Sequence, residues 1–113
     1  MRFLLTYNGT DTNPDPEKMQ EIANFTQEMA KSGVLLDTGG ILPLAAKVRQ
    51  SAGTFTHTDG PFPETKELVV GYAIVQVKSQ AEAVELARRF MAVAGDGTGE
   101  IRQLMGPADG PHH

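Results

Sequence analysis

The most apolar run of the chain reads Leu68-Val69-Val70-Gly71-Tyr72-Ala73-Ile74-Val75-Gln76-Val77. Apolar side chains fall on both alternating faces of this run, which is typical of a strand covered on both sides. A helix start follows at once, because Ser79 and Glu82 have the spacing of a capping box and residues 83–91 carry apolar side chains at helical spacing. The run therefore predicts a central strand that leads directly into an amphipathic helix.

The amino-terminal part of the chain shows the same order of strand and helix. Residues 2–8 alternate like a strand, and Asp15-Pro16 is typical of an N-cap followed by the first helical position. Apolar residues recur at helical spacing up to Gly33, which suits the position just past a helix end. Residues 34–42 predict a second strand, in which Gly39-Gly40 favours a bulge or a bend.

Two smaller elements complete the order. Residues 47–49 and 54–57 flank a turn-forming Ser-Ala-Gly and predict a short β-hairpin, and residues 99–105 predict a last strand. The sequence therefore predicts an α+β, ferredoxin-like βαββαβ fold, an antiparallel sheet with both helices on one face. We expect one domain over residues 1–106 and a flexible tail over 107–113, whose His112-His113 is either native or left from a tag.

The other face of this sheet needs a cover. The central run is apolar on both faces, but both helices of the predicted fold lie on the same side. A second copy of the chain is the simplest cover, because closed symmetric dimers are the commonest soluble assemblies. We therefore expect a homodimer that packs through its sheets.

Composition narrows the function classes. The 113 residues carry 10 Lys and Arg against 14 Asp and Glu, a net charge of −4, and no basic run that could follow a phosphate backbone, which disfavours nucleic-acid partners. The chain has no cysteine, so disulfides and thiolate chemistry are excluded. No segment approaches the length of a membrane span. We expect a soluble, cytoplasmic protein without a membrane partner.

The run of residues 56–67 concentrates the groups that could do chemistry. His57 and Asp59 could form an acid–base pair, since a nearby carboxylate orients a histidine and raises its basicity. Two residues so spaced share a face only if the segment is extended. The alternatives are a solvated loop histidine and an aspartate that caps its own turn before Gly60-Pro61.

Four further side chains are candidates for holding a substrate. Arg49 could bind a carboxylate or phenolate through paired hydrogen bonds, or it is a plain exposed arginine on an edge strand. Glu64 and Lys66 lie in the same run, where a surface ion pair is the simpler interpretation. Tyr72, like Tyr7, suits either a core position with a bonded hydroxyl or an acid role. Nucleotide-binding loops, a G-x-S-x-G elbow and histidine pairs at metal-ligand spacing outside the tail are missing, so we expect no cofactor and no metal.

These residues also match a family pattern. The sequence resembles the DGPF branch of the YCII-related family in its motif Asp59-Gly60-Pro61-Phe62, in Glu64-Thr65-Lys66-Glu67 and Gly71-Tyr72, and in Tyr7, Leu42-Pro43, Val48-Arg49 and the Ser79–Glu82 helix start. The resemblance implies a ferredoxin-like fold in the dimeric α+β barrel superfamily, with a cleft by the DGPF loop.

The resemblance also implies two classes of function. Relatives with an assigned activity act on small cyclic or aromatic compounds, for example by dehydrochlorination, with a His and an Asp as acid–base groups. Asp59 best matches that Asp, whereas the usual histidine lies near the first helix, where this chain has none, so His57 would be a substitute. The first hypothesis is therefore a cofactor-independent lyase or isomerase. The alternative is a non-catalytic, ligand-binding or regulatory dimer with a protein partner such as a sigma factor.

Overall fold

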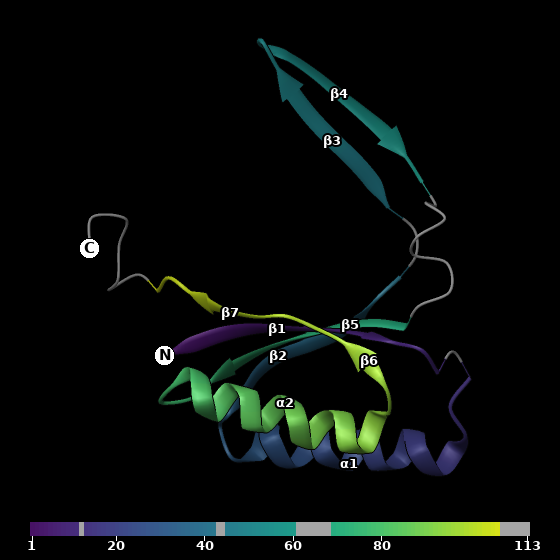
Figure 1. Cartoon of the computed structure of the whole chain (residues 1–113), viewed down its shortest axis with the longest axis vertical. Coiled ribbons are helices and arrows are strands. Elements are labelled where there is room, and N and C mark those ends of the chain that lie inside the picture. Colours follow the sequence, from purple (N-terminus) through teal and green to yellow (C-terminus); the bar gives the residue numbers. More distant parts are fainter. Residues whose placement is uncertain (12, 43–44, 61–68, 107–113) are drawn as a thin grey trace.

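The computed structural model describes residues 1–11, 13–42, 45–60 and 69–106. Figure 1 shows a sheet with two helices beneath it and a separate hairpin above it. The elements follow in the order β1 (Arg2–Gly9), α1 (Pro16–Lys31), β2 (Leu35–Ile41), β3 (Ala46–Ser51), β4 (Thr54–Asp59), β5 (Val69–Gln76), α2 (Gln80–Ala94), β6 (Gly97–Thr98) and β7 (Ile101–Leu104). The predicted α+β class is confirmed.

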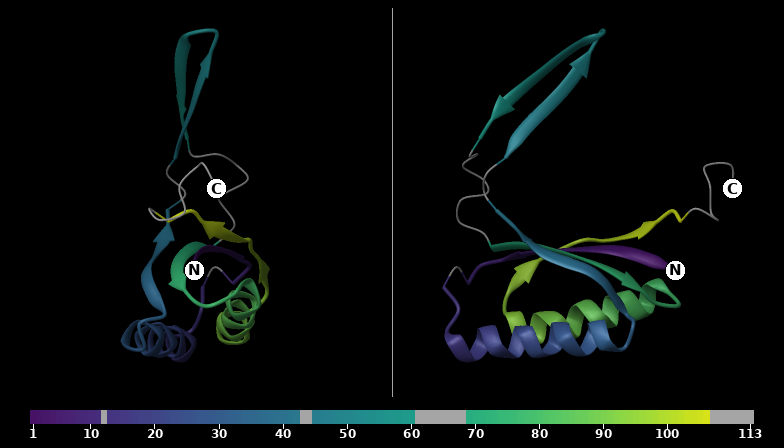
Figure 2. Two further views of the ribbon diagram at one scale, coloured as in Figure 1. Left: turned by 90° about the vertical axis from the view of Figure 1, so that its left-hand side faces the viewer. Right: turned by 180° about the vertical axis from the view of Figure 1, so that it is seen from behind.

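The main sheet has the strand order of a ferredoxin-like fold. β5 lies between β2 and β1, and β6 and β7 both pair with β1 on its far side, all antiparallel. Both helices cover the same face of this sheet, as the views in Figure 2 show. The sheet therefore has a helix-covered face and an open face.

Strand register decides which side chains meet the helices. Phe3 lies opposite Val75, each is 1% exposed, and both belong to the core cluster with Ala83 and Leu86 of α2. Their alternate neighbours along β5, such as Ile74, point to the open face and are only half-buried. In the single chain, the helices therefore cover one face of β5. The expectation that this strand is covered on both faces is confirmed for the helix-covered face alone.

Both helices begin where the sequence predicts. The Asp15 side chain accepts a hydrogen bond of 2.8 Å from the Lys18 backbone N–H, and Ser79 accepts one of 3.2 Å from the Glu82 N–H. The return bond of the capping box goes to the N–H of Lys78, one residue earlier than the usual pattern. These caps fix the two points at which the chain leaves a loop or strand and enters a helix.

Two details of the predicted strands are different. The irregularity in β2 lies between Leu35 and Asp37, so the prediction of a bulge at Gly39-Gly40 was wrong. Gly39 and Gly40 pair in regular register with Tyr72 and Gly71. The lack of a side chain therefore does not disturb the strand pairing here. The last strand is split into β6 and β7. The predicted tail over residues 107–113 lies outside the described residues.

The predicted hairpin is confirmed over β3 and β4, which pair antiparallel from Ala46–Asp59 to Ser51–Thr54. Its two-residue turn has positive φ angles at Ala52 (51°) and Gly53 (82°). Such a turn matches the twist of paired strands. Figure 1 shows the hairpin rising on the open side of the main sheet, away from the helices.

Candidate functional site

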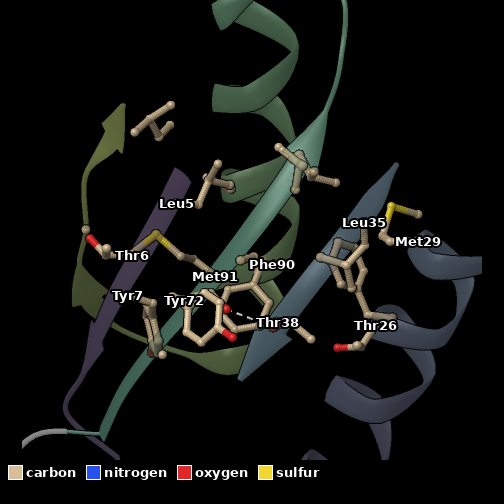
Figure 3. A pocket seen from close by; sticks show the side chains of 18 of the residues that line it. Leu5, Thr6, Tyr7, Thr26, Met29, Leu35, Thr38, Tyr72, Phe90 and Met91 are labelled. Carbon is tan, nitrogen blue, oxygen red and sulfur yellow. Dashed lines mark hydrogen bonds between the residues drawn. The ribbon is translucent and has the colours of Figure 1, made fainter. Parts of the chain in front are cut away.

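A cavity of about 480 Å³ lies between the helices and the sheet. Figure 3 shows side chains of β1, β2 and β5 and of both helices around it. The residues that line it on the helices are Ile22, Phe25, Thr26, Met29, Leu86, Ala87, Phe90 and Met91. The volume lies in the range of small-molecule sites, and most of the lining is apolar.

The floor of the cavity includes a patch of bare backbone. Gly71 of β5 lies opposite Tyr7 on one side and Gly40 on the other, so both glycines belong to the helix-covered face. A Cβ at Gly40 would lie 3.9 Å from the Val70 carbonyl oxygen, and one at Gly71 would lie 3.4 Å from the Gly39 carbonyl oxygen. The glycines therefore leave open space that larger side chains would fill.

Aromatic rings close one end of the cavity. The Tyr7 ring meets Phe90 edge to face at a centroid distance of 5.2 Å, and Phe25 lies 6.2 Å from Phe90. The guanidinium of Arg89 stacks over the outer side of Phe25 at 5.3 Å. These contacts join β1, α1 and α2 at one place and give the cavity an aromatic wall.

The Tyr7 hydroxyl ties this wall to the turn after α2. The hydroxyl lies within donating distance of two carbonyl oxygens, that of Gly95 at 2.9 Å and that of Asp96 at 3.1 Å. Burial raises the pKa of Tyr7, and the nearby Lys18 opposes that shift. Lys18 in turn forms an ion pair of 2.9 Å with Asp11, which raises the pKa of Lys18 and lowers that of Asp11.

Few polar groups face the cavity. Thr38 donates a hydrogen bond of 2.8 Å to the Tyr72 carbonyl, drawn in Figure 3, and its oxygen keeps acceptor capacity. The Thr26 hydroxyl makes no hydrogen bond with any described residue. Glu100 is the one charged residue among the described lining residues, and it is engaged by Arg102 at 3.0 Å. The site offers hydroxyls rather than cations.

Tyr72 occupies the opposite face of the sheet from this aromatic wall. It lies across from Thr6 and Gly39, and a Cβ at Gly39 would touch its ring at 3.0 Å. Its hydroxyl donates to the Asp37 carboxylate at 3.0 Å, and this bond raises the pKa of Tyr72. Of the two predicted substrate-binding residues that the structure describes, Arg49 and Tyr72, Tyr72 borders the cavity through its place in β5.

The predicted acid–base pair lies elsewhere. His57 and Asp59 are both on β4, with 3.9 Å between His57 Nε2 and Asp59 Oδ1, and their side chains are 58% and 81% exposed. The extended strand does bring the two onto one face, but neither lines the cavity. The separation exceeds the reach of a hydrogen bond.

The predicted substrate-binding residues are also dispersed. Arg49 pairs with Thr56, so it lies on the face of the hairpin opposite to His57. Glu64 and Lys66 lie outside the described residues. Among the described residues, Arg49 and Tyr72 are thus not brought together with the His57–Asp59 pair, and the roles of all four substrate-binding residues stay predictions.

Sequence reasoning missed the cavity itself. Its aromatic wall comes from Phe25 and Phe90. The helical pattern includes Phe90 only as part of an apolar stripe, and it does not single out Phe25. Two glycines in the sequence could have indicated the cavity. Gly40 and Gly71 interrupt runs that otherwise favour strands, and glycines paired on one face of a sheet leave space between the sheet and a helix layer.

The described residues include neither a membrane-spanning helix nor a cluster of metal ligands. In those parts of the chain, no helix has the length and apolar character that crossing a membrane requires. Groups of three or more His, Asp or Glu side chains placed to hold a metal ion are also absent from them.

Fold and cavity together define a ferredoxin-like α+β protein with an apolar site between its sheet and its helices. Residues 1–106 match the YCII-related domain family. The chain is also 32% identical over 93 residues to the uncharacterized protein R00369 of Rhizobium meliloti (strain 1021), an alignment that covers 80% of this chain and 75% of that relative. The protein belongs to the YCII-related domain family, which confirms the resemblance at the level of the family.

The two tyrosines give a direct test of this geometry. Because both pKa values are raised, for Tyr7 mainly by burial and for Tyr72 mainly by the Asp37 bond, both should ionise above the ordinary value of about 10. A raised pKa means that the stabilising contribution is present below the unfolded-state pKa and is lost as the pH rises through the folded-state pKa. Absorbance titration of Tyr7→Phe and Tyr72→Phe, each with one tyrosine left, measures the two values separately. Equal midpoints in buffer and in denaturant would contradict the structure.

Proposed function

We propose that this protein is a homodimer that binds a small, neutral, mostly apolar compound with a flat ring in the cavity between its sheet and its helices. The observation that carries the proposal is the cavity of about 480 Å³ with its aromatic wall. A pocket of this size with a few convergent polar groups is the default candidate for a binding site.

The lining supports this choice of ligand. The bare backbone at Gly40 and Gly71 leaves a flat floor, against which a planar ring fits better than a branched aliphatic group. Phe90 and Tyr7 offer a ring edge and a ring face at its end. Hydroxyls of Thr26 and Thr38 could bond to one or two polar atoms, and the absence of a cation among the described lining residues disfavours an anion.

A second candidate function is acid–base catalysis by a cofactor-independent lyase or isomerase. The observation in its favour is that His57 and Asp59 share one face of β4, 3.9 Å apart. In that scheme Asp59 would move a proton with help from His57, and Arg49, Glu64, Lys66 and Tyr72 would hold the substrate. The exposure of the pair and its distance from the cavity place this candidate second.

The open face of the sheet supports the proposed homodimer. The strand register puts Ile74 and Tyr72 there, both half-buried in the single chain, and Ile41 at 49% exposed. Apolar residues on a strand face that no described element covers indicate a partner surface. A second copy would present the same surface, which gives a closed, self-complementary contact. The same dimer could also act as a regulatory protein that binds a further protein partner. The motif Asp59-Gly60-Pro61-Phe62 supports the proposal that the chain belongs to the DGPF branch of the family.

Ligand binding is tested by filling the cavity. Ala87→Leu places a larger side chain among the lining residues and should abolish binding of small neutral aromatic compounds while leaving the fold intact. Ala81→Leu, on the exposed side of the same helix, is the matched control and should bind as the wild type does. Binding is measured by calorimetry and by ligand-induced rises in melting temperature. The proposal fails if no neutral aromatic compound in a broad panel binds, or if both variants bind equally.

Catalysis is tested with the compounds that bind. If the protein only binds, the wild type should show no turnover, and His57→Asn and Asp59→Asn should leave affinity unaffected. If the two residues act as acid and base, each change should lower turnover by about 100-fold or more. Product formation is followed by chromatography. A turnover that depends on both residues would promote the enzyme to first place.

The dimer is tested on the open face. Ile74→Lys adds a charge to the proposed interface and should shift the protein to a monomer, whereas Val84→Lys, at a 49% exposed position on α2, should not. Light scattering coupled to size-exclusion chromatography reports the mass. A wild-type protein that is monomeric at tens of micromolar, or an Ile74→Lys variant that remains dimeric, would contradict the interface.

A further inference from the structure

The β3–β4 hairpin receives little support from the rest of the chain. Every residue of Ala46–Ser51 and Thr54–Asp59 is exposed. Figure 2 shows from two further directions that the hairpin stands clear of the main sheet. Because a two-stranded hairpin is at best marginally stable alone in water, its order requires a surface to pack against.

The turn does not supply the missing stability. Both turn residues have positive φ, a conformation that favours Asn-Gly, yet the first position holds Ala52 at 51°. An alanine there is strained, since its Cβ crowds the neighbouring carbonyl. Local turn chemistry therefore works against the hairpin, and the stabilising contribution must come from packing of its faces.

The two faces of the hairpin are different. Val48 lies opposite His57, and Phe55 opposite Gln50, which puts both apolar side chains on one face, 66% and 60% exposed. The other face carries Lys47, Arg49 and threonines 54, 56 and 58. One face is suited to burial and the other to water.

Two features indicate a second copy of this chain as the occupant. The hairpin rises on the open side of the main sheet, so a copy seated on that sheet lies beside it (Figure 1). The open sheet face is also apolar, with Ile74 and Ile41 on it, so the Val48 and Phe55 side chains would meet a surface of the same kind there. Lys47 and Arg49 lie on the opposite hairpin face, toward water, and Asp59 shares the packed face at the end of the hairpin away from the turn.

We propose that the hairpin is a dimerisation arm, which packs its Val48 and Phe55 face against the open sheet face of the partner subunit. This inference rests on the proposed homodimer and adds to it a contact that occurs twice, once for each arm, in a closed two-fold dimer. His57 lies on the packed face and is therefore carried to the partner's body instead of to the cavity of its own chain.

The first experiment changes one hairpin face at a time. Val48→Asp and Phe55→Asp should each weaken dimerisation by about tenfold or more in sedimentation equilibrium, as expected for apolar residues at the centre of a contact. Thr56→Asp, on the opposite face of β4, is the matched control and should leave the dissociation constant unchanged. Circular dichroism confirms that each variant is folded. Equal dissociation constants for all variants would overturn the arm.

The second experiment locates the contact and needs no destabilising change. The chain has no cysteine, so Phe55→Cys labelled with a benzophenone maleimide carries a single photo-crosslinker. Mixed with isotope-labelled chains, it should yield crosslinks between chains that map to β1 or β5 of the partner. Crosslinks within one chain, or only between two hairpins, would overturn the proposal. If the wild type is monomeric, both the arm and the proposed dimer are wrong. If a dimer forms but the hairpin variants do not weaken it and no crosslink reaches the partner's sheet, only the arm is wrong.

Discussion

The pairing of β5 with both β1 and β2 is the constraint on which the rest of the structure depends. Its eight residues are in register with β1 from Val69 to Gln76, and this register places Val75 against Phe3 at the centre of the core. A shift by one residue would turn Val75, Ala73 and Gly71 to the open face and bring Tyr72 and Ile74 beneath the helices. Core, cavity floor and open face are therefore all set by one ladder.

Much of this arrangement could be predicted from local sequence. Asp15-Pro16 and the Ser79–Glu82 pair marked both helix starts correctly because capping depends on a few neighbouring residues. The hairpin was predictable for the same reason. The glycine pair Gly39-Gly40 predicts a bulge at the wrong place in β2, because the actual register shift, between Leu35 and Asp37, involves no glycine.

The candidate site was less accessible to sequence reasoning. His57 and Asp59 stand out by residue type, yet what a polar pair can do depends on burial, and both are exposed here. The cavity is the opposite case: its walls are ordinary core residues such as Phe25 and Phe90, and only the tertiary spacing between sheet and helices leaves space among them. Helical periodicity identifies residues that face inward, but it does not say how completely they fill the interior.

The register between β2 and β5 also indicates which segment of the chain can vary in length. Ile41 lies directly opposite Val70, so a short turn would be enough to join these two strands. The described elements between them, β3 and β4, form a separate two-stranded sheet outside the main one. Such a segment can be lengthened, shortened or exchanged between relatives without changing the order of the sheet or the shape of the cavity. The fold thus separates the part of the chain that holds the cavity from a part that can diverge on its own.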